Sequence, residues 1–337
     1  TRPPPRSTRI ECRRQRQMCI RDSMKALVAF IVSGRWQAAL ITACCGVLSL
    51  LVPWLGGVLN YLAAAVVGLV TLHVGMLPGL QVLVIATAVT VLFYQLVGVQ
   101  AAIGLVMVLM LWMPCWITSA VLRQSRDLGQ ALRAATVFGV ILLLAVFVMF
   151  GDPAAWWLEQ LQAIALHLEE MGVVDSPLGD PELQQQIAPL LTGVVLASLV
   201  IGVIASLLLA RWSQSVLVHP GGFRDEIYRL RMGFVTGLAT LAVMLMARLT
   251  QGTFSDFSAQ LAMIMLVPYL LVGLAVIHSL LKQNSRGSGW LIAVYVLLAV
   301  VPQATLLLAA GGLVDTWVDF RRRLGRGGDS PDNETRD

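Results

Sequence analysis

Long apolar segments separated by short polar stretches dominate the chain. From residue 37 onward, runs of about 20 apolar residues recur, which is the length that a helix needs to cross a hydrocarbon core of about 30 Å. No stretch shows the alternation of apolar and polar residues that is typical of a strand. Helices also satisfy their own backbone hydrogen bonds in lipid. The pattern therefore predicts an all-α fold, a polytopic transmembrane helical bundle with about 9–10 membrane helices.

The apolar runs also indicate where spans begin and end. The run at 37–75 is too long for one span, and the PWLGG sequence at 53–57 predicts a hairpin. Pro302 interrupts the last run, at 290–320, and the residue before a proline avoids helical geometry. We therefore expect a short re-entrant hairpin there, with one tilted span as the alternative. The other spans are expected at 78–97, 99–122 with a turn near Gly98, 134–151, 189–212, 233–250 and 259–281.

Charged residues predict the orientation of these spans. Arg and Lys bias short loops toward the cytoplasm, and the basic loops near 123–133, 211–232 and 282–286 fall on one side if the spans alternate. The loop at 152–188 carries seven acidic residues and no Lys or Arg, so we expect it outside. The terminal hairpin returns the arginine-rich tail, 321–337, to the cytoplasm. Both ends of the membrane domain, 24–320, are thus expected on the cytoplasmic side.

An amphipathic outer helix is predicted within the acidic loop. Asp152 is a suitable N-cap, and Pro153 suits the first helical position. Five apolar residues recur at intervals of four and three on one face. They are Trp157, Leu161, Ile164, Leu168 and Met171. We interpret this helix as an interfacial lid over the bundle, and a gate over a solute site is the alternative.

A second amphipathic segment, FRDEIYRLR at 223–231, is expected on the cytoplasmic face. Phe223, Ile227 and Leu230 share one side of a helix, and basic residues occupy the others. Such a helix would lie at the membrane interface and anchor the topology through anionic headgroups. A surface for docking a partner is the alternative interpretation.

Composition agrees with a membrane protein and argues against a nucleic-acid partner. The chain is 57% hydrophobic and 13% charged, with a formal net charge of +5. Seven of the 24 basic residues and two of the 19 acidic residues lie within 1–22, which leaves 17 of each elsewhere. The lead ends in MCIRDS, which resembles a translated transposase mosaic end of the kind used to tag sequencing libraries. We therefore interpret 1–23 as a disordered sequencing or cloning scar, with a basic cytoplasmic tail as the alternative and Met24 as the start.

Motifs that carry catalysis are absent from the sequence. It has no GxxxxGK[ST] phosphate loop, no HExxH zinc pair and no GxSxG elbow. Cys44, Cys45 and Cys115 lie in apolar spans, where buried thiols are the ordinary interpretation. Spans one to eight hold no deep acidic residue for a proton relay. We expect no catalytic, cofactor or metal site, and hence no enzyme.

A few polar residues inside the spans are candidates for a solute site. A pocket open to the outer half of the bundle would draw on the outer ends of the third, fourth, seventh and eighth spans. Arg248 would hold an anionic group there, unless it merely reaches the outer surface beside Asp256. The candidate solute-binding residues are Tyr94, Gln95, Gln100, Arg248 and Tyr269.

Small residues at intervals of four predict close helix packing. Ser198, Gly202, Ser206 and Ala210 form one such ridge, and Gly233 and Gly237 repeat the spacing. Packing within the bundle is favoured over a dimer face, because a bundle of this size offers many internal partners.

Three segments resemble a known family. MKALVAFIVSGRWQAAL at 24–40, GGFRDEIYRLRMG at 221–233 and GGLVDTWVDFRRR at 311–323 are similar to sequences of the YybS-like family of uncharacterised bacterial integral membrane proteins. That family is thought to be distantly similar to the substrate-binding S components of energy-coupling-factor transporters. The resemblance implies a bacterial inner-membrane location and a solute site. It supplies no functional residues.

Two functional classes follow. The first is a solute-binding or transport subunit, which would need a transport ATPase and coupling subunits as partners because it has no nucleotide motif of its own. The second is a non-transporting membrane scaffold or assembly factor, which would dock partners through FRDEIYRLR and the arginine-rich tail. The lipid bilayer is the common partner of both. The sequence does not specify the solute or the oligomeric state.

Overall fold

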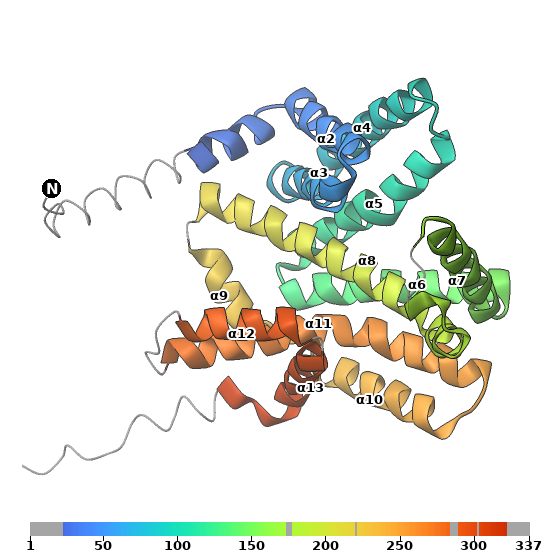
Figure 1. The fold of residues 1–337 in the computed structure, drawn as a ribbon. Helices are drawn as coiled ribbons and strands as arrows, with labels where there is room; N and C mark the ends of the chain where they lie inside the picture. Colours follow the sequence, from blue (N-terminus) through green and yellow to red (C-terminus); the bar gives the residue numbers. More distant parts are fainter. Residues whose placement is uncertain (1–22, 173–176, 220, 284–288, 302, 322–337) are drawn as a thin grey trace, which may run out of the picture. The chain divides into compact units, whose positions relative to one another are not determined.

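The computed structural model describes residues 23–172, 177–219, 221–283, 289–301 and 303–321 (Figure 1). All the secondary structure in these ranges is helical, which confirms the predicted all-α fold. Six of the described helices are long and apolar enough to cross a membrane, or up to eight spans if each of two bent helix pairs counts as one. The segment interpreted as a scar lies outside the described residues, apart from Ser23.

The chain forms two compact units. Unit 1 comprises residues 1–126 and 202–225, and unit 2 comprises 127–201 and 226–337. Unit 1 holds the helix Ser23–Val32, α2 (Arg35–Leu51), α3 (Pro53–His73), α4 (Met76–Leu96) and α5 (Ala101–Ser125). Unit 2 holds α6 (Leu128–Phe150), α7 (Pro153–Glu170), the 3₁₀ turn η1 (Pro177–Gly179), α10 (Phe234–Leu249), α11 (Thr253–Gln283), α12 (Gly289–Val300) and α13 (Gln303–Val318). Both units share α8 (Pro181–Val218) and the short α9 (Gly222–Tyr228).

Unit 1 is built around two helical hairpins. The predicted break at PWLGG is confirmed, since α2 ends at Leu51 and α3 begins at Pro53. The predicted turn near Gly98 is also confirmed, with a φ of 81° that glycine adopts without strain. Between the hairpins, the indole N–H of Trp112 donates to Oδ1 of Asn60 at 2.7 Å. This bond satisfies two polar groups inside the unit.

The small-residue ridge of α8 packs inside unit 1, as predicted. A Cβ at Gly202 would lie 2.5 Å from the ring of Tyr61, and the Ala210 Cβ lies 3.1 Å from where a Cβ at Gly68 would be. Ser206 is buried and donates to the carbonyl of Gly202 at 2.9 Å. Intramolecular packing therefore accounts for this part of the ridge.

Helix α8 extends beyond the predicted span at both ends. The sequence pattern placed a span at about 189–212, and α8 begins at Pro181 and runs for 38 residues. The side chain of Asp180 accepts from the N–H of Glu182 at 2.9 Å, and proline follows the cap directly. A polar first turn hid this helix start, because the span was judged by apolar length alone.

The amphipathic helix α7 forms where it was predicted. Asp152 caps it by accepting from the N–H of Ala154 at 3.0 Å. Leu161 and Ala165 are buried, whereas Ile164 is 48% exposed and Met171 is 60% exposed. Within unit 2, burial therefore covers only part of the predicted stripe, and its role at the membrane interface remains a prediction. The indole N–H of Trp157 donates to Thr192 of α8 at 2.8 Å and so joins the two helices.

The expected helix over FRDEIYRLR is shorter than predicted. α9 ends at Tyr228, and Leu230 lies beyond it in irregular backbone, where it is 4% exposed. Backbone carbonyls of this irregular segment accept hydrogen bonds from arginine side chains instead of from a further helical turn.

The last apolar run is broken, as predicted. α12 and α13 meet at an angle of 119° across a short break. The end of α13 lies beside the beginning of α10: the ring of Trp317 is 3.1 Å from where a Cβ at Gly237 would be, and it stacks edge-on with Phe234. α13 therefore returns to the end of unit 2 where α10 begins. The cytoplasmic location of that end remains a prediction.

Candidate functional site

Of the three predicted site residues in unit 1, one is buried and two are exposed. Tyr94 is 4% exposed, and its hydroxyl donates to the carbonyl of Gly46 at 3.0 Å. Its ring packs so closely against Gly104 that a Cβ at that glycine would lie 2.8 Å from the ring. Gln95 and Gln100 are exposed near the turn that joins α4 and α5. Tyr94 thus acts as a packing residue that joins α2, α4 and α5.

The two predicted site residues in unit 2 lie far apart. Arg248 is exposed in the last turn of α10, next to the connection to α11. Tyr269 lies in the middle of α11, about 24 Å along that helix from its first residue at a rise of about 1.5 Å per residue. Within the described residues, no ion pair joins Arg248 to Asp256. A shared pocket for Arg248 and Tyr269 is therefore not formed in unit 2, whereas the relation of either residue to unit 1 remains a prediction.

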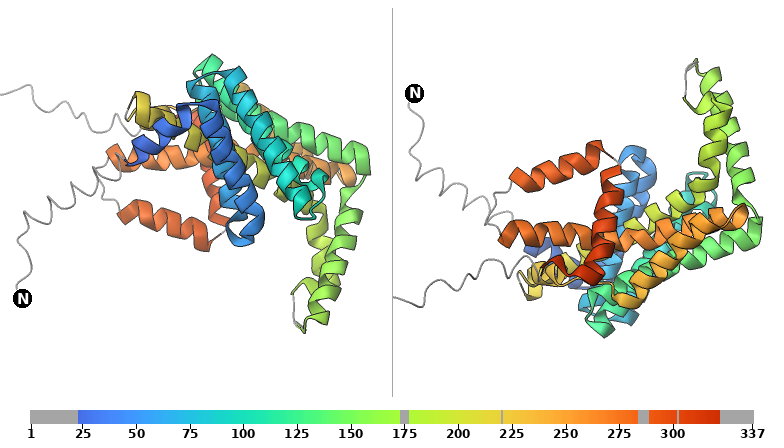
Figure 2. Two further views of the ribbon diagram at one scale, coloured as in Figure 1. Left: turned by 90° about the horizontal axis from the view of Figure 1, so that it is seen from above. Right: turned by 90° about the horizontal axis from the view of Figure 1, so that it is seen from below.

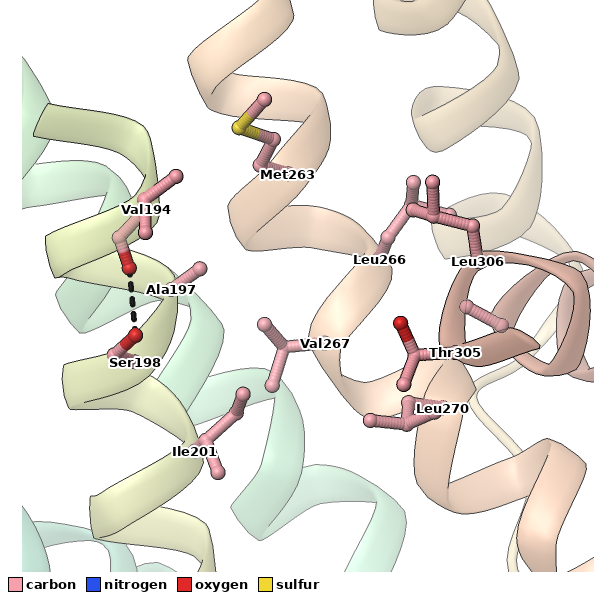
Figure 3. Close-up of a pocket in the computed structure, with 11 residues that line it drawn as sticks. Val194, Ala197, Ser198, Ile201, Met263, Leu266, Val267, Leu270, Thr305 and Leu306 are labelled. Atoms are coloured by element: carbon pink, nitrogen blue, oxygen red, sulfur yellow. Dashed lines mark hydrogen bonds between the residues drawn. The ribbon is translucent and has the colours of Figure 1, made fainter. Parts of the chain in front are cut away.

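Unit 2 contains a different candidate site, an apolar groove between α8, α11 and α13 (Figure 3). Its volume is about 330 Å³. α8 and α11 are both among the candidate membrane spans, so the groove lies within apolar helices. Eleven residues line it: Val194, Ala197, Ser198, Ile201, Met263, Leu266, Val267, Leu270, Thr305, Leu306 and Ala309.

The lining is suited to hydrocarbon. None of its side chains is ionisable, and two of the eleven carry a hydroxyl. The hydroxyl of Ser198 donates to the carbonyl of Val194 at 2.8 Å, so it is satisfied within its own helix (Figure 3). A strongly polar solute would lose its hydration here without gaining matching partners. The groove can therefore bind apolar groups by excluding water and by dispersion contacts.

Local sequence features shape two walls of this groove. Ala197 and Ser198 are small, so α8 leaves space on that face. Pro268 lies inside α11, where it removes a backbone donor and favours a bend. The predicted small-residue ridge thus has two roles, because Ser198 lines the groove while the residues beyond it pack within unit 1.

The third wall, α13, is placed by a glycine crossing. A Cβ at Gly312 would overlap the carbonyl oxygen of Tyr269, and a Cβ at Gly273 would overlap that of Leu308. The main chains of α11 and α13 are therefore in direct contact, which small residues permit. Figure 2 shows α13 crossing α11. Thr305, Leu306 and Ala309 project from the part of α13 before the crossing.

Within the described ranges, no three His, Cys, Asp or Glu side chains are placed to hold a metal ion together.

Comparisons with known proteins found no match. No protein-family model matches the chain, and neither the search of curated proteins nor that of solved structures found a similar protein.

Proposed function

We propose that this is an integral membrane protein that binds a lipophilic solute in the groove of unit 2. The observation that carries the proposal is the groove's wholly non-ionisable lining, which α8 and α11, two helices of membrane-spanning length, share with α13. Its volume of about 330 Å³ falls at the lower end of the range for ligand pockets, which is about 300–1,000 Å³. The proposed role is solute binding rather than catalysis.

The chemistry of the lining favours a hydrocarbon chain as the occupant. Nine of the eleven lining side chains are aliphatic or, in Met263, a thioether. An alkyl chain buries apolar surface against them without leaving a polar group of its own unpaired. The solute is therefore proposed to be an amphiphile that inserts its chain.

A transport system is the cellular setting that we propose. The resemblance to the YybS-like family and, through it, to S components supports a bacterial inner-membrane protein that supplies the solute site. The sequence lacks a phosphate-binding loop, so energy would come from partner ATPase and coupling subunits. Copurification in mild detergent tests this part: an associated ATPase pair supports transport.

Photolabelling tests the groove directly. The purified protein is irradiated with a fatty acid that carries a diazirine near the end of its chain, and labelled peptides are identified by mass spectrometry. We expect labels on residues 194–201 and 263–270 that an excess of unmodified fatty acid removes. Labels spread evenly over the other apolar helices would contradict the proposal.

Two neighbouring valines supply a matched pair of variants. Val194 lines the groove and is 47% exposed, whereas Val195 does not line it and is 49% exposed. Val194→Trp should fill the groove and abolish most of the competed labelling, while Val195→Trp should leave it unchanged. Equal labelling of both variants would mean that the fatty acid binds elsewhere.

A scaffold is the second candidate function, and one observation favours it. Arg231, in the first of the two segments that the sequence suggested for docking, pairs at 2.8 Å with Asp319, which lies just before the arginine-rich tail. A partner protein could therefore contact the segment after α9 and the end of α13 at once. A stable complex without transport subunits, together with no competed photolabelling, would favour this function over the first.

A further inference from the structure

The helix Ser23–Val32 turns sharply away from α2 in unit 1 (Figure 1). The bend between the two helices is 110°, so this helix lies nearly across the axis of α2. Its 10 described residues are about 15 Å long, and at this angle its two ends differ in height along α2 by only about 5 Å. α2 alone has 17 residues, which is enough for a short span. The preceding helix is therefore not needed to complete that span.

The break between the two helices is a defined turn. The hydroxyl of Ser33 donates to the carbonyl of Phe30 at 2.7 Å, and the N–H of Ser33 reaches the same carbonyl at 3.3 Å. Gly34 is extended, and its carbonyl accepts from the N–H of Ala38 at 3.2 Å. Polar groups that a helix end leaves free are thus satisfied locally. The sequence Ser33–Gly34 builds the bend.

The turn lies at the end of unit 1 where α4 begins. Arg35 donates to Oε1 of Gln81, in the second turn of α4, at 3.5 Å, and its guanidinium lies 5.7 Å from the ring centroid of Trp36. Trp36 is 63% exposed. At the same end, the indole N–H of Trp116 donates to the carbonyl of Met76, the first residue of α4, at 3.0 Å. Tryptophans gather at membrane boundaries, so the helix leaves α2 at the height where a boundary is expected.

This end of unit 1 is strongly basic. The described residues of the unit, at 23–126, 202–219 and 221–225, include six Lys or Arg and one acidic residue, Asp225. Arg123 of α5 and Gln214 of α8 both donate to the carbonyl of Leu72, in the last turn of α3, so the basic ends of α5 and α8 lie here too. An anionic surface is the complementary partner. The six basic residues are Lys25, Arg35, Arg123, Arg126, Arg211 and Arg224.

The helix Ser23–Val32 has a separate side for each kind of contact. Val28 and Ile31 are 3% and 6% exposed, so they pack against the protein. Leu27 and Phe30 are 50% and 52% exposed and form an apolar face without a protein partner in unit 1. At about 100° per residue, Lys25 lies about 160° around the helix from Leu27 and about 140° from Phe30. This division is typical of a helix that lies in the membrane interface.

We propose that Ser23–Val32 is an interfacial helix that binds the anionic surface of the bilayer. Leu27 and Phe30 insert between the upper parts of the acyl chains, and Lys25 and Arg35 contact the lipid phosphates. The helix thereby anchors the start of α2 at the membrane boundary. This contact with lipid headgroups is independent of the groove in unit 2 and of its solute.

Nitroxide labels measure the depth of the helix. Leu27, Ala29 and Phe30, which are all exposed, are replaced singly by cysteine on a background whose native cysteines are alanine. The labelled protein is reconstituted into vesicles of phosphatidylcholine and phosphatidylglycerol, and power saturation with oxygen and with a water-soluble nickel complex gives each depth. We expect Leu27 and Phe30 about 5–10 Å below the headgroups. Their depths should agree within about 2 Å, since the helix lies nearly across α2.

Ala29 separates an interfacial helix from a spanning one. It lies between Leu27 and Phe30 in sequence but on another side of the helix, so its label should be shallower than both. A helix that continued α2 through the membrane would instead place the three labels in sequence order, with about 4.5 Å from Leu27 to Phe30. That order would overturn the proposal.

Vesicles of phosphatidylcholine alone test the charges. The labels at Leu27 and Phe30 should lie shallower there than in the anionic vesicles. Lys25→Gln should reduce this difference, and Lys25→Arg should preserve it. The matched control is Arg126→Gln, which removes one positive charge from the same end of unit 1 but outside the helix, and should leave the difference intact.

Three further results would contradict the inference. Free access of the nickel complex to Leu27 and Phe30 would place the apolar face in water. Exclusion of both reagents would show that protein and not lipid covers the face. Equal depths in both kinds of vesicle would show that an anionic surface is not the partner.

Discussion

Gly312 of α13 lies directly on the main chain of Tyr269 in α11, so that a single methyl group at position 312 would overlap the tyrosine carbonyl. Its neighbour Gly311 faces open space, with no atom of another helix within 4 Å of where a Cβ would be. Two adjacent glycines of one helix therefore differ completely in what they contribute. Gly312 permits the helix crossing that forms the groove, and Gly311 does not.

The two glycines give the first prediction. Gly312→Ala should destabilise the protein by about 1–3 kcal/mol, because overpacking forces the two backbones apart. Gly311→Ala should be neutral or stabilising by up to about 1 kcal/mol, because alanine favours a helix over glycine. Thermal unfolding in one detergent compares them. Equal midpoints for both variants would show that the crossing is not as close as the structure describes.

A second prediction concerns the end of α3. Arg123 donates to the carbonyl of Leu72 at 2.6 Å, in the last turn of that helix. Arg123→Ala should lower the free energy of unfolding by about 1.5–3 kcal/mol, the usual contribution of a hydrogen bond to a charged group. Arg126 is exposed nearby and serves as the control, since Arg126→Ala also removes one positive charge. Loss of stability in both variants alike would indicate an effect of charge and not of helix capping.

Reporter fusions supply a third prediction, about topology. Fusions after Glu170 should report the outer side, and fusions after Arg126, Arg229 and Arg326 should report the cytoplasm. The fusions after Arg229 and Arg326 should report the same side. Arg321 binds the carbonyls of Tyr228 and Leu230, so both segments must lie on one side of the membrane. An outer signal at Arg326 alone would mean that the final run crosses the membrane once.

Arg248 provides the fourth prediction. It is exposed in the last turn of α10, where a cation interacts favourably with the helix dipole. Arg248→Ala should therefore cost only about 0.3–1 kcal/mol of stability and should leave competed photolabelling of the groove unchanged. Arg248→Lys, which keeps the charge, should behave like the parent. If Arg248→Ala abolished labelling while folding normally, the polar site suggested by the sequence would regain support.

Helix positions were largely predictable because membrane spans obey a length rule. The breaks at Pro53 and Gly98 carry their own signals, a proline that starts a helix and a glycine that turns the chain. The missed start of α8 also has a signal, the Asp180–Pro181 pair, which apolar length did not register. The burial of α7 could not be predicted, because it depends on contacts such as the bond from Trp157 to Thr192 of α8.

The candidate site was much less predictable. Polar residues in apolar spans suggested a pocket, yet Tyr94 uses its hydroxyl within unit 1, on a carbonyl that no sequence pattern identifies. The groove is lined by ordinary apolar residues, which look the same in sequence whether they pack, face lipid or surround a cavity. Ser198 was noticed only as part of a packing ridge.

By itself, the sequence determined that this chain is a helical membrane protein, because a span needs about 20 apolar residues and satisfies its own backbone bonds in lipid. These are local properties of consecutive residues. Tertiary structure alone decided that α13 crosses α11 at Gly312, that Arg321 binds carbonyls some 90 residues away, and that a groove remains between three helices. Each depends on how close two distant backbones come, and that distance results from packing over the whole unit.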